Sequence, residues 1–116
     1  SPIQYTVEPL NNEKMLNGKL WILVSENVFS SSEYAAMFTK ATGFATLVGT
    51  RTGGDGIGVD PIPVVMPNSG LIVRYSPVYG VSYDGSGSQE FGTEPDIISP
   101  DGEDALTTCL KIINNK

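Results

Sequence analysis

The sequence contains no histidine and a single cysteine, Cys109. Any reaction that needs an imidazole base must therefore obtain it from outside this chain. One cysteine cannot form a disulfide within the chain, and its place in an apolar helical repeat predicts a core residue rather than a reactive thiol. Because zinc sites are built mostly from histidine and cysteine, the sequence predicts no metal site, and nothing in it indicates another cofactor.

Basic residues and long hydrophobic runs are also scarce. The 116 residues include 7 lysines and arginines against 13 aspartates and glutamates, which gives a formal net charge of −6. No basic cluster is present to neutralise a phosphate backbone, so nucleic acid is not an expected partner. The longest apolar run, 20–24, is far shorter than the roughly 20 residues that cross a bilayer, and no membrane insertion is expected.

The residues that are present indicate one folded, loop-rich domain. Apolar residues make up 40% of the chain and charged residues 17%, and there are 13 glycines and 8 prolines. This balance is typical of a globular chain rather than a disordered one. A chain of this length can form a single modest core, so we treat 1–116 as one unit.

The first half of the chain predicts a strand, a helix and a second strand. The continuous apolar run over 19–25 favours a strand buried on both faces, which we expect to be central in its sheet. Helical spacing over 31–41, closed by Gly43, is followed by a second short strand over 44–49. Such a βαβ unit predicts a parallel pair of strands. The apolar residues of the predicted helix are Tyr34, Met37, Phe38 and Ala41.

The second half predicts a hairpin, a loop and a helix. Two β segments, 64–67 and 70–80, meet at a turn-like Pro-Asn-Ser-Gly, and the glycine-rich stretch 83–96 is expected to be a surface loop. Asp101 is expected to cap the final helix. Its apolar stripe would consist of Ala105, Leu106, Cys109, Leu110 and Ile113.

Two ligand-binding motifs begin in this sequence and fail. Gly49 and Gly54 have the spacing of a phosphate-binding loop, but Asp55 stands where that loop needs lysine and would repel phosphate. The stretch 84–95 starts like a calcium-binding EF-hand loop, yet Pro95 occupies the position of the bidentate acid. Neither a nucleotide site nor an EF-hand is expected.

The serines at the start of the first predicted helix admit two interpretations. A helix N-terminus at the edge of a sheet offers free N–H groups, so Ser30 is a candidate nucleophile with the Ser31 N–H as an oxyanion donor. Alternatively, Ser30 is only an N-cap and Glu33 completes a capping box. The local pattern alone favours the capping interpretation.

A nucleophilic serine also needs a base within hydrogen-bonding distance, and the chain offers few. Lys40 follows Ser30 by ten positions on the same helix, which places it about 15 Å away at 1.5 Å per residue. Arginine keeps its charge and cannot accept the proton. Glu33 faces away from the strand end, and Glu90 lies in a loop. Neither is convincing as the sole base.

Four motifs in order resemble the C-terminal processing (tail-specific) protease family of serine endopeptidases. The segment 18–54 contains a buried strand, a Ser-x-Ser-Glu helix start, a strand ending in Val-Gly and a Thr-x-Gly turn. The stretch 91–97 resembles the Gly-x-x-Pro-Asp-Ile segment of that family, and 101–113 resembles its closing helix. Between them, 59–83 is similar only in general character.

The resemblance implies an α/β fold of the crotonase/ClpP-like ββα type, with a mixed, partly parallel sheet and two main helices. It further implies that 1–116 is the C-terminal half of the catalytic domain of a longer chain. The activity implied is cleavage of peptide bonds through an acyl-enzyme, with a peptide or protein as substrate. Many members of the family work outside the cytoplasm, which favours a periplasmic, secreted or cell-surface location.

Residue by residue, the resemblance makes Ser30 the nucleophile, with Ser31 as the oxyanion donor. The lysine of the common Ser-Lys dyad is replaced by Asp55. A second branch, which resembles the core domain of the tricorn protease, uses an upstream histidine and a glutamate just before the Gly-x-x-Pro-Asp segment, where Glu90 stands. The expected catalytic set is therefore Ser30 and Glu90, with the histidine outside this chain.

Substrate contacts and rival functions complete the expectations. A peptide could add to the edge strand over 71–79, with Tyr75 or Tyr79 lining a side-chain pocket. One rival is a catalytically dead module that binds a ligand or peptide, which the loss of the lysine at Asp55 would allow. Another is an acyl-thioester enzyme of the crotonase type, which needs no serine nucleophile. The oligomeric state stays open.

Overall fold

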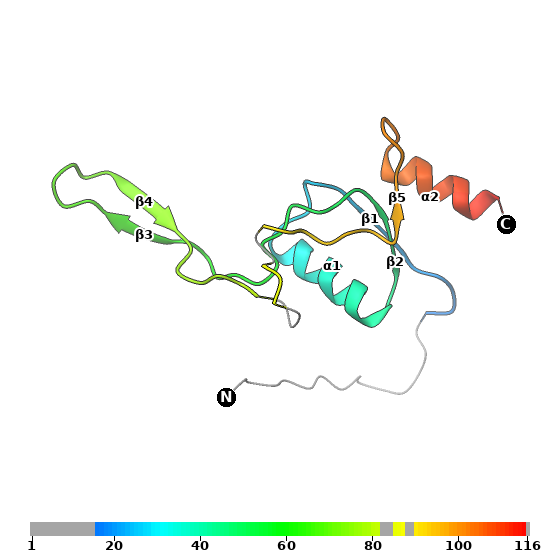
Figure 1. Ribbon diagram of the computed structural model, residues 1–116, viewed down its shortest axis with the longest axis horizontal. Coiled ribbons are helices and arrows are strands. Elements are labelled where there is room, and N and C mark those ends of the chain that lie inside the picture. Colours follow the sequence, from blue (N-terminus) through cyan, green and yellow to red (C-terminus); the bar gives the residue numbers. More distant parts are fainter. Residues whose placement is uncertain (1–15, 82–84, 88–89, 116) are drawn as a thin grey trace.

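The computed structural model describes residues 16–81, 85–87 and 90–115. A body of strands and helices carries a long hairpin that extends away from it (Figure 1). The elements in chain order are β1 (Trp21–Val24), α1 (Ser31–Thr42), β2 (Thr46–Gly49), β3 (Ile62–Val65), β4 (Ile72–Tyr75), β5 (Ile97–Ile98) and α2 (Ala105–Asn114).

The body is built on a parallel three-stranded sheet of order β1-β2-β5. β1 and β2 pair from Trp21 with Thr46 to Val24 with Gly49, so the predicted βαβ unit is confirmed. The expectation that the first strand is central is wrong among the described residues, because β2 has a partner on each side. Leu47 is 0% exposed, whereas Leu23 of β1 is 42% exposed.

Helix α1 packs on β2 through small and polar side chains. Its buried residues are Glu33, Ala36 and Thr39, and Ala36 joins Val24 and Leu47 in the core cluster. The predicted apolar face is therefore not the buried one: Tyr34 is 62% and Phe38 52% exposed. The helix ends at Gly43, which adopts the left-handed conformation as expected.

Asp96 joins three elements near the start of β5. Its carboxylate accepts hydrogen bonds from Lys40 Nζ at 2.5 Å and from the Leu47 N–H at 2.9 Å. Its own N–H donates to the Leu47 carbonyl at 2.9 Å. The Lys40 hydrogen bond, followed by that from the Leu47 backbone, lowers the pKa of the Asp96 carboxyl.

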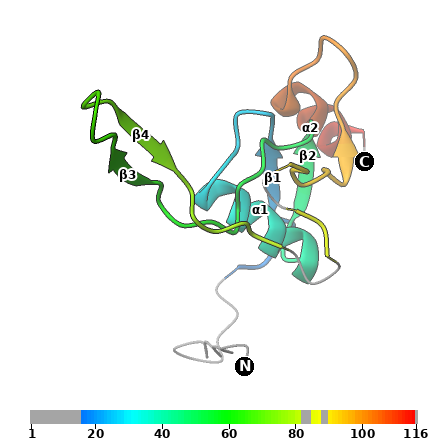
Figure 2. The ribbon, with the colours of Figure 1, turned by 60° about the vertical axis from the view of Figure 1, so that its left-hand side comes forward.

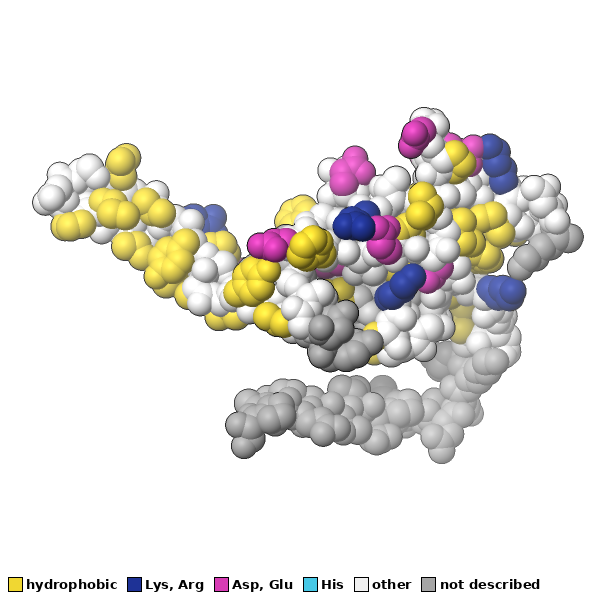
Figure 3. Space-filling model, viewed as in Figure 1, with side chains coloured by type: hydrophobic (Ala, Val, Ile, Leu, Met, Phe, Trp, Pro, Cys, Tyr) yellow, Lys and Arg dark blue, Asp and Glu magenta, His cyan; other side chains and the backbone are white. Residues whose placement is uncertain are grey.

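The predicted hairpin is confirmed, with shifted limits. β3 and β4 are antiparallel, from Ile62 opposite Tyr75 to Val65 opposite Ile72, and a turn closed by Gly70 joins them. All eight side chains of the two strands are exposed. The hairpin stands clear of the body in a second view (Figure 2), and its surface is largely apolar (Figure 3).

The final helix begins later than predicted. Asp104, not Asp101, is the N-cap of α2, and its side chain accepts a hydrogen bond from the Thr107 N–H at 2.8 Å. Asp101 lies in the preceding turn, which the Glu103 N–H closes on the Pro100 carbonyl at 3.0 Å. The predicted N-cap therefore lies three residues before the observed one.

Only part of the expected apolar stripe of α2 is buried. Cys109 is buried, as predicted, and Ala105 is half-buried. Leu106, Leu110 and Ile113 are exposed. Within the described ranges, no helix is long and apolar enough to cross a membrane.

We expect Asp96→Asn to weaken the fold near neutral pH. Its lowered pKa means that the folded state favours the carboxylate, so this stabilisation is present above the unfolded pKa, about 3.9, and is lost as the pH falls below it. The free energy of unfolding should fall by about 1 kcal/mol at pH 7, because a charged hydrogen bond at a half-exposed site is replaced by a neutral one.

Urea denaturation at pH 7 and pH 3 measures this effect. The difference between Asp96→Asn and the natural sequence should shrink at pH 3, because the unfolded aspartate, with a pKa of about 3.9, is then largely protonated and the unfolded state is favoured. Asp101→Asn, in the exposed turn, is the control and should change stability by less than about 0.5 kcal/mol. An equal difference at both pH values would show that the Asp96 charge contributes nothing.

Candidate active site

Ser30 occupies a strained position between β1 and α1. Its backbone has φ 58° and ψ −129°, a region that residues other than glycine seldom adopt and that costs about 1–3 kcal/mol. Its side chain makes no capping hydrogen bond. The interpretation of Ser30 as a simple N-cap is therefore wrong, since a strained serine without a capping bond stabilises the helix poorly.

The backbone around Ser30 is held by the glycine turn that follows β2. Ser30 donates its N–H to the Gly54 carbonyl at 3.2 Å, and the Gly53 N–H donates to the Val28 carbonyl at 2.7 Å. Phe29 and Gly54 form a parallel bridge. A Cβ at Gly53 would lie 2.6 Å from the Glu26 carbonyl oxygen, so glycine is needed for this approach.

The N-terminus of α1 supplies unpaired donors next to the serine hydroxyl. The Ser30 carbonyl accepts the first bond of the helix, from the Tyr34 N–H at 3.0 Å. No hydrogen bond to the N–H groups of Ser31 and Ser32 occurs within the described part of the chain. Free N–H groups at the positive end of a helix dipole stabilise a developing oxyanion, so Ser31 is placed as an oxyanion donor requires.

Ser30 and Ser31 open into a cavity of about 410 Å³. The other lining residues are Tyr34, Asp55, Gly56, Gly58, Val59, Asp60 and Pro61. Asp55 is exposed, with φ 63°. It thus lies in the cavity with the serine, at the position where the dyad enzymes have lysine. Among the described residues, no three acidic or cysteine side chains are grouped so as to hold a metal ion.

The structure places Glu90 with Tyr79 rather than with Ser30. Glu90 is exposed, is hydrogen-bonded to the Tyr79 side chain, and is not among the residues that line the cavity. Partial desolvation, followed by the charge and hydrogen bond of Glu90, raises the pKa of the Tyr79 phenol. The phenolic oxygen also packs closely on Gly87, where a Cβ would lie 1.9 Å from it.

Tyr75 lies on the projecting hairpin. It belongs to β4, pairs with Ile62 and is exposed. Like Tyr79, it is absent from the cavity beside Ser30. Of the residues predicted from the sequence, the structure therefore brings Ser30 together with Ser31, and Glu90 together with Tyr79.

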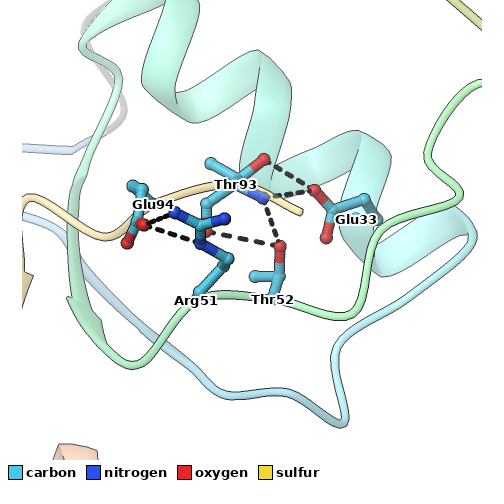
Figure 4. A network of polar contacts seen from close by, with 5 residues as sticks. All are labelled: Glu33, Arg51, Thr52, Thr93 and Glu94. Atoms are coloured by element: carbon cyan, nitrogen blue, oxygen red, sulfur yellow. Dashed lines mark hydrogen bonds and ion pairs between the residues drawn. The ribbon is translucent and has the colours of Figure 1, made fainter. Parts of the chain in front are cut away.

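A buried polar network, which the sequence patterns did not predict, lies one helical turn from Ser30 (Figure 4). Glu33 is 1% exposed and accepts hydrogen bonds from Thr93, through the N–H at 3.0 Å and the hydroxyl at 2.6 Å. The Thr93 N–H also donates to the Thr52 hydroxyl at 2.6 Å. The expected capping box is thus wrong, because the Glu33 carboxylate bonds to Thr93. Its helical spacing with Ala36 and Thr39 was the signal available in the sequence.

A family model for peptidase family S41 matches residues 3–99. The chain belongs to peptidase family S41. This finding confirms the resemblance to a serine peptidase family that the motifs predicted. It does not distinguish the Ser-His-Glu branch from the Ser-Lys branch, so the choice between them stays a prediction.

Solved structures of CPAF and of the tricorn protease resemble this chain. Mature CPAF has 30% identity and a TM-score of 0.54, over 67% of this chain and 15% of that one. CPAF complexed with lactacystin has 26% identity and a TM-score of 0.60, over 82% of this chain and 19% of that one. The tricorn protease has a TM-score of 0.64 over 84% of this chain and 10% of that one; at 20% identity it shows the fold alone.

The S41 chain therefore spans at most 19% of the length of these three structures. The α/β fold of this chain, with its parallel sheet and two helices, matches part of these structures, as the motifs predicted. No curated protein sequence matches the chain significantly.

The strain at Ser30 predicts that a glycine variant at this position is more stable than an alanine variant. Glycine adopts a positive φ without the steric cost that any side chain incurs. Ser30→Gly should therefore unfold with a free energy about 1 kcal/mol higher than Ser30→Ala. Denaturation in urea measures the difference.

Ser32 provides the matched control, since it lies in the first turn of the same helix with an exposed side chain. There the order should reverse, because glycine in a helix is about 0.5–1 kcal/mol less favourable than alanine. If Ser30→Ala proves as stable as Ser30→Gly, the backbone at Ser30 is not strained in solution.

Proposed function

We propose that this chain forms the C-terminal part of the catalytic domain of a serine endopeptidase of the C-terminal processing type, with Ser30 as nucleophile. The observation that carries the proposal is the strained Ser30 at the N-terminus of α1, beside a cavity and next to an unpaired Ser31 N–H. Membership of family S41 supports the same activity.

The reaction proceeds through an acyl-enzyme. Ser30 Oγ forms a bond to the carbonyl carbon of the scissile peptide, while a histidine from outside this chain takes the hydroxyl proton. The carbonyl oxygen becomes an oxyanion, to which the Ser31 N–H donates. The C–N bond then breaks as the imidazolium protonates the leaving amine. In the second half of the reaction the histidine takes a proton from water, which attacks the ester, and returns that proton to Ser30 Oγ as the acid product leaves.

Glu90 is the proposed acid of this triad. In such a triad the carboxylate orients the imidazole and stabilises its protonated form. Three observations favour this branch over a Ser-Lys dyad. Asp55 stands in the lysine's place, and Lys40 is paired with Asp96 in the last turn of α1. No lysine is among the described residues that line the cavity.

Tyr75 and Tyr79 are proposed substrate contacts. Both rings are exposed, and β4 belongs to a two-stranded sheet whose other edge is available to an extended peptide. A peptide or protein is accordingly the proposed substrate.

The alternative functions are less consistent with the strain at Ser30. A non-catalytic binding module of the same fold gains nothing from a serine held at φ 58° where glycine would be more stable. An acyl-thioester enzyme needs the oxyanion donors but not the hydroxyl. The replacement of lysine by Asp55 is the observation that favours the binding module.

The 116-residue chain by itself should hydrolyse no peptide, because oxyanion donors without a base leave a serine hydroxyl largely unactivated. Incubation with an unstructured protein, followed by mass spectrometry, tests this. The longer protein that supplies the histidine should cleave the same substrate, and Ser30→Ala should abolish that cleavage. Cleavage by the isolated chain that depends on Ser30 would contradict the proposed source of the base.

Glu90→Gln in the longer protein should reduce kcat by about 10²–10⁴, because the amide keeps the size of the side chain but removes the charge that favours imidazolium. Stability should barely change. The double variant with Ser30→Ala should be about as slow as Ser30→Ala alone, since residues that act as one unit are not additive. If the fold-reductions in kcat of the two single variants multiply in the double variant, Glu90 works independently of the serine.

A further inference from the structure

A buried carboxylate lies one helical turn from the nucleophile, and the triad does not use it. Glu33 is 1% exposed, and its Oε2 atom has no hydrogen-bond partner in the described part of the chain. Burying a carboxylate is costly unless its oxygens are well paired. Stability alone therefore gives little reason to keep an acid here, and within the described part of the chain Thr93 supplies both hydrogen bonds that its side chain accepts.

Those bonds connect the helix of Ser30 to the segment of Glu90. Glu33 follows Ser30 by three residues, and Thr93 follows Glu90 by three residues. The Glu33 Oε1 atom accepts from both the N–H and the hydroxyl of Thr93, at 3.0 and 2.6 Å. A displacement of either segment along the other would break both bonds.

Thr52 holds Thr93 from the other side. The Thr52 N–H donates to the Thr93 carbonyl at 3.1 Å, and the Thr93 N–H donates to the Thr52 hydroxyl at 2.6 Å. Gly92 permits the approach, since a Cβ there would lie 1.9 Å from the Thr52 carbonyl oxygen. The three residues Glu33, Thr52 and Thr93 thus form a clamp between α1, the turn after β2 and the segment before β5.

A triad needs such a clamp because its acid and its nucleophile do not touch. Each contacts the histidine, so the gap between them must fit one imidazole, and a misplacement of about 1 Å can cost roughly 10²-fold in rate. In the structure, Glu90 is hydrogen-bonded to Tyr79 and is not among the described residues that line the cavity of Ser30. The clamp is the hydrogen-bonded link between their segments.

We propose that Glu33 is a positioning residue, which through Thr93 fixes the distance between the Glu90 segment and Ser30. This inference rests on the proposed triad. Glu33 touches neither the substrate nor the reacting atoms, so its loss should lower kcat rather than raise KM.

The test uses the longer, active protein. Glu33→Ala removes both bonds to Thr93 and should lower kcat about 10–100-fold, with KM within about threefold. Thr93→Val removes only the hydroxyl and should lower kcat about 3–10-fold, which provides a milder variant if Glu33→Ala fails to fold. Glu94→Gln is the matched control: it disrupts the neighbouring exposed ion pair with Arg51 but not the clamp, and kcat should stay within twofold.

A double-mutant cycle with Glu90→Gln decides whether Glu33 acts through Glu90. In that background, Glu33→Ala or Thr93→Val should change kcat by less than about threefold, because the acid being positioned has already lost its function. A merely structural role would lower kcat equally in both backgrounds. That outcome, or a folded Glu33→Ala variant with unchanged kcat, would overturn the inference.

Failure of the inference is distinguishable from failure of the triad. If Glu90→Gln alone leaves kcat unchanged, the triad assignment is wrong, and the role of Glu33 in positioning Glu90 is wrong with it. If Glu90→Gln strongly reduces kcat and Glu33→Ala reduces it by the same further factor in that background, only the positioning role of Glu33 is wrong.

Discussion

The close pairing of Val24 with Gly49 at the end of the first two strands determines how the rest of the site is built. A Cβ at Gly49 would lie 1.8 Å from the Val24 carbonyl oxygen, so only glycine allows the strands to stay paired there. The Thr50 N–H donates to that same carbonyl at 3.1 Å, and 28–30 then runs beside 53–54. The ladder between parallel strands thus continues beyond the sheet and brings the serine and the glycine turn together.

A hydrogen-bonded or ion-paired carboxylate holds helix α1 near each of its ends. These contacts stabilise the helix in a position that keeps the Ser30 backbone strained. Glu33 is bound to Thr93 near the start of the helix, and Lys40 is bound to Asp96 near its end. A residue held at an unfavourable φ relaxes unless its surroundings over-determine its position. Long-range contacts therefore offset the cost at Ser30, which lines one cavity together with Ser31.

Local sequence patterns predicted the elements that depend on nearby residues. They failed where contacts with residues distant in the sequence determine which side chains are buried. The βαβ unit, the hairpin and the burial of Cys109 follow from period and turn chemistry. The apolar pattern of α1 did not identify its buried face, because the Glu33 carboxylate is paired there with Thr93, 60 residues later. The capping interpretation of Ser30 failed for the same reason. The local sequence is the same whether Glu33 completes a capping box or bonds to a distant threonine.

The polar clamp also has a consequence for how the protein folds. It joins residues 60 positions apart, and the Lys40–Asp96 pair joins residues 56 apart. Contacts between residues so distant in sequence require large loops to close and form slowly compared with local ones. The helix and the hairpin depend on nearby residues, whereas the clamp requires the C-terminal segment to arrive. We therefore expect the contacts around Ser30 to form in two stages: those with the turn at Gly54 come first, and the clamp at Glu33 closes only when the C-terminal segment has been synthesised and has docked.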